Sequence, residues 1–82
     1  MPLYLVSYDL NKPEKDYPKL INYLESINAH RMLYSEWFVR TNLTRDALYS
    51  AVRAHIDAND GLLVCTTPDA IGINLKYDIA KV

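Results

Sequence analysis

The sequence predicts a small α+β fold in the order β-α-β-β-α-β, with one extra β-strand at its C-terminal end. Two segments, 17–27 and 44–56, carry apolar residues at the spacing of amphipathic helices. The remaining apolar and aromatic segments have the composition of strands: 3–10, 29–42, 62–66 and 73–79. Because the chain has 82 residues, half of them hydrophobic, residues 1–82 are expected to form one domain with a small core.

The first predicted strand, 3–10, is uncharged except near its end, where Asp9 stands. Alternate residues of this strand face opposite sides and both sets are largely apolar, so we expect an internal strand covered on both faces. Asp9 then projects at the rim of the sheet. Burying an unpaired carboxylate costs several kcal/mol, so Asp9 is expected to cap a helix, pair with a cation or hold a metal.

The first helix is predicted over 17–27. Asp16 is a suitable N-cap, Pro18 fits the first turn, and Asn28 ends the helix. The segment that follows is too long and too β-rich for a loop, and we interpret it as a hairpin with a tight connection at Tyr34 and Ser35. One kinked strand is the alternative.

The second helix begins after Thr44, a preferred N-cap residue, and its apolar stripe includes His55. The Asn-Asp-Gly run at 59–61 stops it, and the buried strand 62–66 follows. The last segment, 73–79, alternates apolar and polar residues most regularly, so it is predicted to be a half-buried strand.

This order of elements indicates a ferredoxin-like βαββαβ arrangement, an antiparallel sheet with both helices on one face. The other face needs a cover, and with Tyr and Leu side chains pointing out from strand 3–10 the simplest cover is a second copy of the sheet in a two-fold homodimer. Tyr4 is expected on that face, where Tyr4→Glu would break the dimer. Strand 73–79 either extends its own sheet or crosses to the partner's edge.

The net charge of −1 gives no overall polyanion-binding signal. Lys12, Lys15 and Lys19 nevertheless cluster after the first strand. Cys65, the single cysteine, lies in an apolar run and is expected to be a buried structural thiol, which indicates a reducing cytoplasm. No basic leader and no long apolar stretch is present, so we expect a cytoplasmic protein without a membrane partner.

Three segments carry a resemblance: YLVSYDL at 4–10, WFV at 37–39 and AHIDANDGLLV at 54–64. Together they resemble the CRISPR-associated Cas-two superfamily, and the opening YLVSYDLNKP..KDY and the S.W.V strand resemble its SinR-like branch. The resemblance implies a ferredoxin-like homodimer in which Asp9 of both copies meets near the dimer axis. Two carboxylates could hold Mg²⁺ or Mn²⁺ there for metal-dependent endonuclease or endoribonuclease activity, so Asp9 is the candidate catalytic and metal residue.

Binding of RNA or DNA is the more general expectation. Ser7 has the same strand parity as Asp9 and can add a hydroxyl to that face, while Lys12, Arg31 and Arg40 are the candidate phosphate contacts. His30 and His55 lack metal-site spacing, and at least one of Trp37 and Phe38 is expected in the core.

Two other functions stay open. A toxin ribonuclease similar to the virulence-associated D family shares the fold and the strand-one aspartate, and growth arrest on expression would favour it. A non-catalytic dimerisation or regulatory module uses the fold for protein contacts alone, which the near-neutral charge favours.

Overall fold

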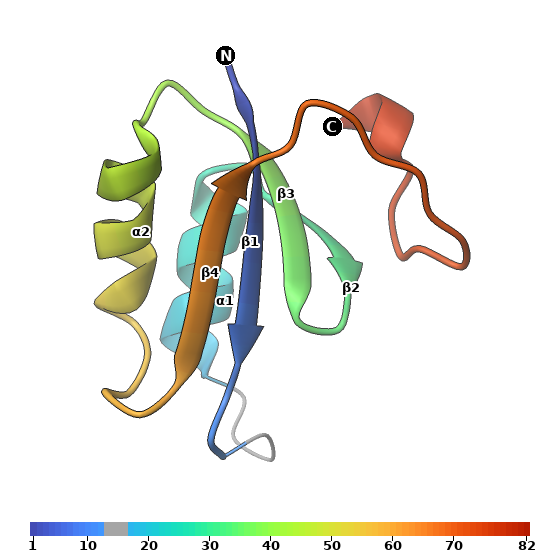
Figure 1. Ribbon diagram of the computed structural model, residues 1–82. Coiled ribbons are helices and arrows are strands. Elements are labelled where there is room, and N and C mark those ends of the chain that lie inside the picture. The colour runs from blue at the N-terminus through green and yellow to red at the C-terminus, as the bar shows by residue number, and fades with distance from the viewer. Residues whose placement is uncertain (13–16) are drawn as a thin grey trace.

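The computed structural model describes residues 1–12 and 17–82, which form a four-stranded antiparallel sheet, two α-helices and an irregular C-terminal segment (Figure 1). The elements are β1 (Leu3–Asp9), α1 (Pro18–Ser26), β2 (His30–Leu33), β3 (Glu36–Arg40), α2 (Arg45–Arg53), β4 (Gly61–Thr66) and a 3-10 helix (Ile79–Lys81). The predicted α+β class is therefore confirmed.

The strands lie in the order β2-β3-β1-β4, and every neighbouring pair is antiparallel. Strand β1 is internal, as its uncharged composition predicts. Val6, at its centre, lies opposite Trp37 of β3 on one side and Val64 of β4 on the other. The order is compatible with a ferredoxin-like arrangement.

The segment after α1 is a hairpin, and the alternative of one kinked strand is wrong. Tyr34 and Ser35 form the predicted turn between β2 and β3. The β2–β3 pairing shifts register between Arg31 and Leu33, an irregularity of the bulge type in the short edge strand β2.

Local sequence signals fix the helix ends. The Thr44 hydroxyl accepts a hydrogen bond from the Ala47 backbone N–H at 3.1 Å, so the predicted cap of α2 is confirmed. Asn28 follows α1 in the left-handed conformation, with φ of 62°, and ends the helix as expected. The predicted N-cap of α1, Asp16, lies outside the described residues.

Both helices pack on one face of the sheet, and the core lies between them (Figure 1). Leu20 and Leu24 of α1 and Leu48 and Val52 of α2 are fully buried against the sheet. The fully or nearly buried residues that this core takes from the strands are Tyr4, Val6, Tyr8, Trp37, Val39 and Val64.

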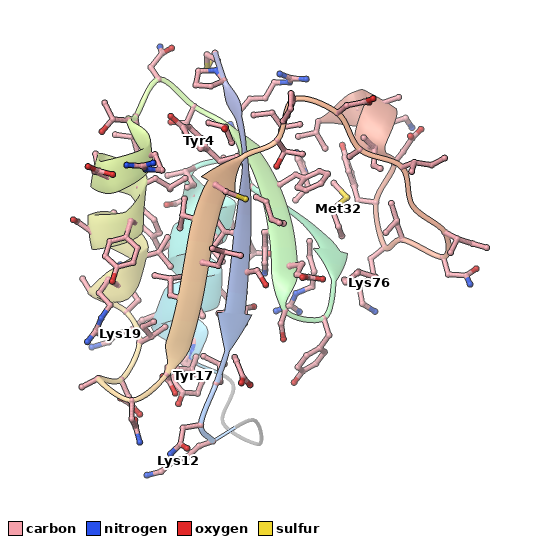
Figure 2. All side chains as sticks on the ribbon, in the orientation of Figure 1. Tyr4, Lys12, Tyr17, Lys19, Met32 and Lys76 are labelled. Atoms are coloured by element: carbon pink, nitrogen blue, oxygen red, sulfur yellow. The ribbon has the colours of Figure 1, made fainter. Side chains whose placement is uncertain are left out.

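The expectation that Tyr4 faces away from the helices is wrong. Its side chain is 4% exposed, shares the parity of Val6, and points toward the helix side of the sheet (Figure 2). Tyr4 tolerates this burial because its hydroxyl donates a hydrogen bond to the Leu43 carbonyl at 2.9 Å.

The predicted strand over 73–79 is also wrong. Beyond β4 the chain makes bends and a 3-10 turn, and its main-chain bond to β2 runs from Lys76 N–H to the Met32 carbonyl at 2.9 Å (Figure 2). Asn74 has φ of 56°, a left-handed conformation that interrupts an extended strand. The alternating apolar side chains Leu75 and Ile79 line a groove over the face of the sheet, and their backbone does not extend its edge.

Candidate functional site

The open face of the sheet, meaning the side away from α1 and α2, is covered over only part of its width. The C-terminal segment lies over β2 and β3 and encloses with them a groove of about 180 Å³ lined by Phe38, Met32 and Leu75, among others. Over β4 the face is bare, since Leu63 is 58% exposed and Cys65 is half-buried, not fully buried as expected. The bare part adjoins β1.

Asp9 ends β1 and belongs by strand alternation to this open face, together with Leu5 and Ser7. It is exposed and lies opposite Gly61, where an added Cβ would come 3.4 Å from the Asp9 Cβ. Within residues 1–12 and 17–82, the Asp9 carboxylate accepts no hydrogen bond and makes no ion pair. Neither capping nor cation pairing therefore accounts for this carboxylate in the described part of the chain.

Ser7 lies on the open face, two residues before Asp9, as its parity predicts. Its hydroxyl donates a hydrogen bond to Glu36 Oε2 at 3.1 Å, and Glu36 is the residue opposite Ser7 in the β1–β3 register. Glu36 thus adds a carboxylate to the same face. Sequence reasoning did not identify it, although the hairpin turn at 34–35 places residue 36 at the start of β3.

The nearby loop before β4 contains a different kind of aspartate. Asp60 Oδ1 accepts from the Asn11 backbone N–H at 2.6 Å, and Oδ2 accepts from the Asp57 backbone N–H at 2.8 Å. Desolvation raises the pKa of the Asp60 carboxyl, but these two donors, the Tyr17 hydroxyl and the Arg53 charge outweigh it and lower the pKa overall. Asp60 is a turn residue, as expected, and its oxygens are already engaged.

The candidate phosphate contacts do not gather around Asp9. Lys12 extends from the loop beyond the end of β1, at the Asp9 end of the sheet (Figure 2). Arg40 lies opposite Leu3 at the other end, where its Nε donates to the Val82 carbonyl at 2.9 Å. Lys15 lies outside the described residues.

Arg31 lies on the helix side of the sheet, not on the open face. Its guanidinium carbon is 4.8 Å from the centroid of the Trp37 ring and 5.7 Å from that of Tyr34. Trp37 Nε1 donates to the Tyr8 hydroxyl at 3.0 Å, and Arg31 Nη2 donates to the same oxygen at 3.4 Å. Tyr8, Arg31 and Tyr34 border a cavity of about 360 Å³ between α1 and β2, which sequence reasoning missed.

The two histidines and the aromatic pair take structural positions. His30 stacks on Tyr77 of the C-terminal segment at 4.1 Å between ring centroids, and His55 stacks on Tyr23 at 5.0 Å. Trp37 and Phe38 are both buried, on opposite sides of β3, which confirms that at least one belongs to the core.

Comparison with known proteins adds no family. No family model matches the chain, and no solved structure matches it significantly. In the two described stretches, 1–12 and 17–82, no helix is long and apolar enough to cross a membrane.

Proposed function

We propose that this chain is a cytoplasmic, Cas-two-like protein with a ferredoxin-like fold, which dimerises through the open face of its sheet and binds RNA or DNA. The observation that carries the proposal is the Asp9 carboxylate, exposed at the end of the central strand with no partner among the described residues. An exposed carboxylate is stabilised by water, so within the described residues Asp9 is accessible to a bound ligand or a partner molecule.

The apolar character of the open face supports a dimer. Leu63 is 58% exposed, Ile71 is 99% exposed and Ile73 is 81% exposed, and the last two belong to the C-terminal segment that borders this face. Exposed apolar side chains on and beside a sheet face that lacks a full cover are a feature of interfaces. A two-fold dimer places the same residues on both sides, so an interface whose two-fold axis passes near the end of β1 would bring two Asp9 carboxylates together.

Paired carboxylates suit a hard divalent cation. Asp9 of each copy would supply carboxylate oxygens to Mg²⁺ or Mn²⁺, and Glu36 lies on the same face as a further oxygen donor. Among the described residues of one copy, no three potential protein ligands lie together, so water and phosphate would complete the shell. When bound, such an ion supplies an activated water and offsets phosphodiester charge, the chemistry of an endonuclease.

Nucleic-acid binding draws on separate basic residues. Lys12 extends past the Asp9 end of the sheet (Figure 2), and Arg40 lies at the opposite end, so each could contact phosphate at the margin of a dimer formed through the open face. Each contact to phosphate releases about one counterion, so affinity should fall as salt rises. Failure to bind RNA or DNA at low salt would count against the proposal.

The decisive experiment compares wild type with Asp9→Asn and with Asp46→Asn, a control whose exposed carboxylate lies on α2. Cleavage of single-stranded RNA and double-stranded DNA is followed with magnesium, with manganese and with EDTA, and the mass of each protein is measured in solution. We expect metal-dependent cleavage by wild type and Asp46→Asn and none by Asp9→Asn, with all three dimeric.

Other outcomes separate the alternatives. If the protein is dimeric and binds nucleic acid without cleaving it, the binding part of the proposal stands and the nuclease part is wrong. Growth arrest on expression that is lost in Asp9→Asn would favour the toxin ribonuclease. A monomeric wild type would remove the paired Asp9 site altogether.

A further inference from the structure

We propose that the cavity between α1 and β2 binds a phosphate monoester carried by a nucleoside, with Arg31 and Tyr8 holding the phosphate. We call this cavity the Arg31 cleft; its described lining residues are Tyr8, Leu10, Pro18, Ile21, Asn22, Arg31 and Tyr34. It opens on the helix side of the sheet, so it is separate from the Asp9 face. The inference does not rest on the proposed function.

The hydrogen bonds of Tyr8 leave a donor unused at this cleft. Its hydroxyl oxygen receives hydrogen bonds from Trp37 Nε1 at 3.0 Å and from Arg31 Nη2 at 3.4 Å. Indole and guanidinium nitrogens only donate, so neither can accept the Tyr8 hydroxyl proton. Within the described residues that proton has no acceptor, although Tyr8 is 6% exposed and borders the cavity.

Arg31 adds a second unused donor. Its Nε atom is buried and has no hydrogen-bond partner among residues 1–12 and 17–82. A guanidinium presents Nε and one terminal nitrogen along the same edge, the edge that grips carboxylates and phosphates with two parallel bonds. Here the terminal nitrogen makes a long bond of 3.4 Å to Tyr8, so the edge is weakly occupied. Donors without acceptors beside one cavity need an acceptor from outside the described chain, and an anion supplies one.

Charge and rigidity agree with this requirement. The Arg31 guanidinium stays protonated at any physiological pH, and none of the described lining residues is acidic. Cation–π contacts with Trp37 and Tyr34 restrict the guanidinium, so less conformational freedom is lost when an anion binds. The cleft therefore presents a positioned positive charge without an internal counter-charge in its described lining.

The remaining space indicates what the phosphate is attached to. The cavity of about 360 Å³ has the size of small-molecule sites and is larger than a phosphate group alone needs. Leu10 and Ile21 offer apolar wall, and Tyr34 at the rim is 65% exposed, an aromatic surface on which a base can stack. The Asn22 amide can donate to and accept from a base edge.

A phosphorylated nucleoside can reach the cleft from two sources, a free nucleotide or the 5′-phosphorylated end of a strand. Calorimetric titration in EDTA tests both, using inorganic phosphate, adenosine, adenosine monophosphate, and a short oligonucleotide with and without its 5′-phosphate. We expect the monophosphate to bind more tightly than phosphate or adenosine. Tighter binding of the phosphorylated than of the unphosphorylated oligonucleotide identifies the strand end as a ligand, and equal binding restricts the cleft to free nucleotides.

Matched variants locate the site. Arg31→Met should weaken binding of the monophosphate about tenfold or more, because it removes a charge-assisted hydrogen bond. Arg45→Met removes an exposed arginine at the start of α2 and should leave binding unchanged. Tyr8→Phe should weaken binding and Tyr49→Phe, at an exposed position on α2, should not.

A measurement on wild type alone does not depend on whether a variant folds. In a ¹H–¹⁵N spectrum of wild type, the Arg31 Nε–H signal should move as adenosine monophosphate is added, while the Arg45 Nε–H signal stays in place. The proposal is overturned if Arg31 Nε–H does not move, or if Arg31→Met and Arg45→Met bind the monophosphate as wild type does. Absence of Asp9-dependent cleavage would leave these results unaffected.

Discussion

Two aspartates at the same end of the molecule are expected to differ sharply in what they contribute to stability. Asp60 binds two backbone N–H groups, at 2.6 and 2.8 Å, whereas Asp9 accepts no hydrogen bond within the described residues. Asparagine in place of Asp60 has one acceptor oxygen, so Asp60→Asn loses at least one charge-assisted bond. A hydrogen bond to a charged group contributes about 1.5–3 kcal/mol, which solvent exposure of this loop reduces to about 1 kcal/mol.

Thermal and urea denaturation at pH 7 measure the difference. For a domain of this size, about 1 kcal/mol corresponds to a fall in Tm of about 4–8 °C for Asp60→Asn. Asp9→Asn should change the free energy of unfolding by less than about 0.5 kcal/mol, the usual range for exposed positions without partners. In a dimer that pairs two Asp9 carboxylates, it should raise stability, because removing like charges relieves repulsion.

The difference in stability between wild type and Asp60→Asn should also depend on pH. The folded-state pKa of Asp60 is lowered, so its ionised form contributes stability that is fully present above its unfolded-state pKa of about 3.9 and is lost as pH falls through the folded-state value. The gap in stability between wild type and Asp60→Asn should therefore close below about pH 4. The reasoning is refuted if Asp9→Asn destabilises the protein as much as Asp60→Asn does.

Three further substitutions test the fold and the open face. Thr44→Ala removes the cap bond to α2 and should cost about 1 kcal/mol in urea denaturation. Tyr4→Phe should also cost about 1 kcal/mol, because it leaves the Leu43 carbonyl without its 2.9 Å donor, yet it should leave the mass in solution unchanged. Leu63→Asp, at an exposed open-face position, should convert a dimer to monomers by analytical ultracentrifugation without changing the circular dichroism spectrum.

Features that depend on neighbours along the chain were predictable. The Thr44 cap, the Asn28 helix end and the Tyr34-Ser35 turn each rest on the chemistry of a few consecutive residues, and the structure has all three. The placement of Asp9 at the end of an internal strand follows from composition alone for the same reason. Its lack of a partner in the described residues does not, because the amide of the nearby residue Asn11 donates to Asp60, which is remote in sequence.

Features that depend on which face meets which element were not predictable. Alternation in β1 defines two sets of side chains but does not say which set faces the helices, and Tyr4 was assigned to the wrong one. Alternation over 73–79 likewise indicates one apolar side without supplying a strand partner. In the structure Leu75 and Ile79 of that side line a groove with Phe38 while Ile73 is exposed, and the backbone does not join a sheet edge.

The Arg31 cleft needed the folded chain because its donors come from separate strands. Tyr8 and Arg31 are 23 residues apart, and Trp37 joins them only because β3 lies between β1 and β2. Tyr8 and Asp9 are consecutive, yet strand alternation sends one toward the helices and the other to the open face. Their surroundings do not overlap: the Tyr8 hydroxyl accepts hydrogen bonds from Trp37 and Arg31, whereas the hydrogen bond on the open face joins Ser7 to Glu36. Loss of the Asp9 carboxylate and loss of the cleft should therefore change the free energy of unfolding independently. In a double variant the change should be the sum of the two single changes.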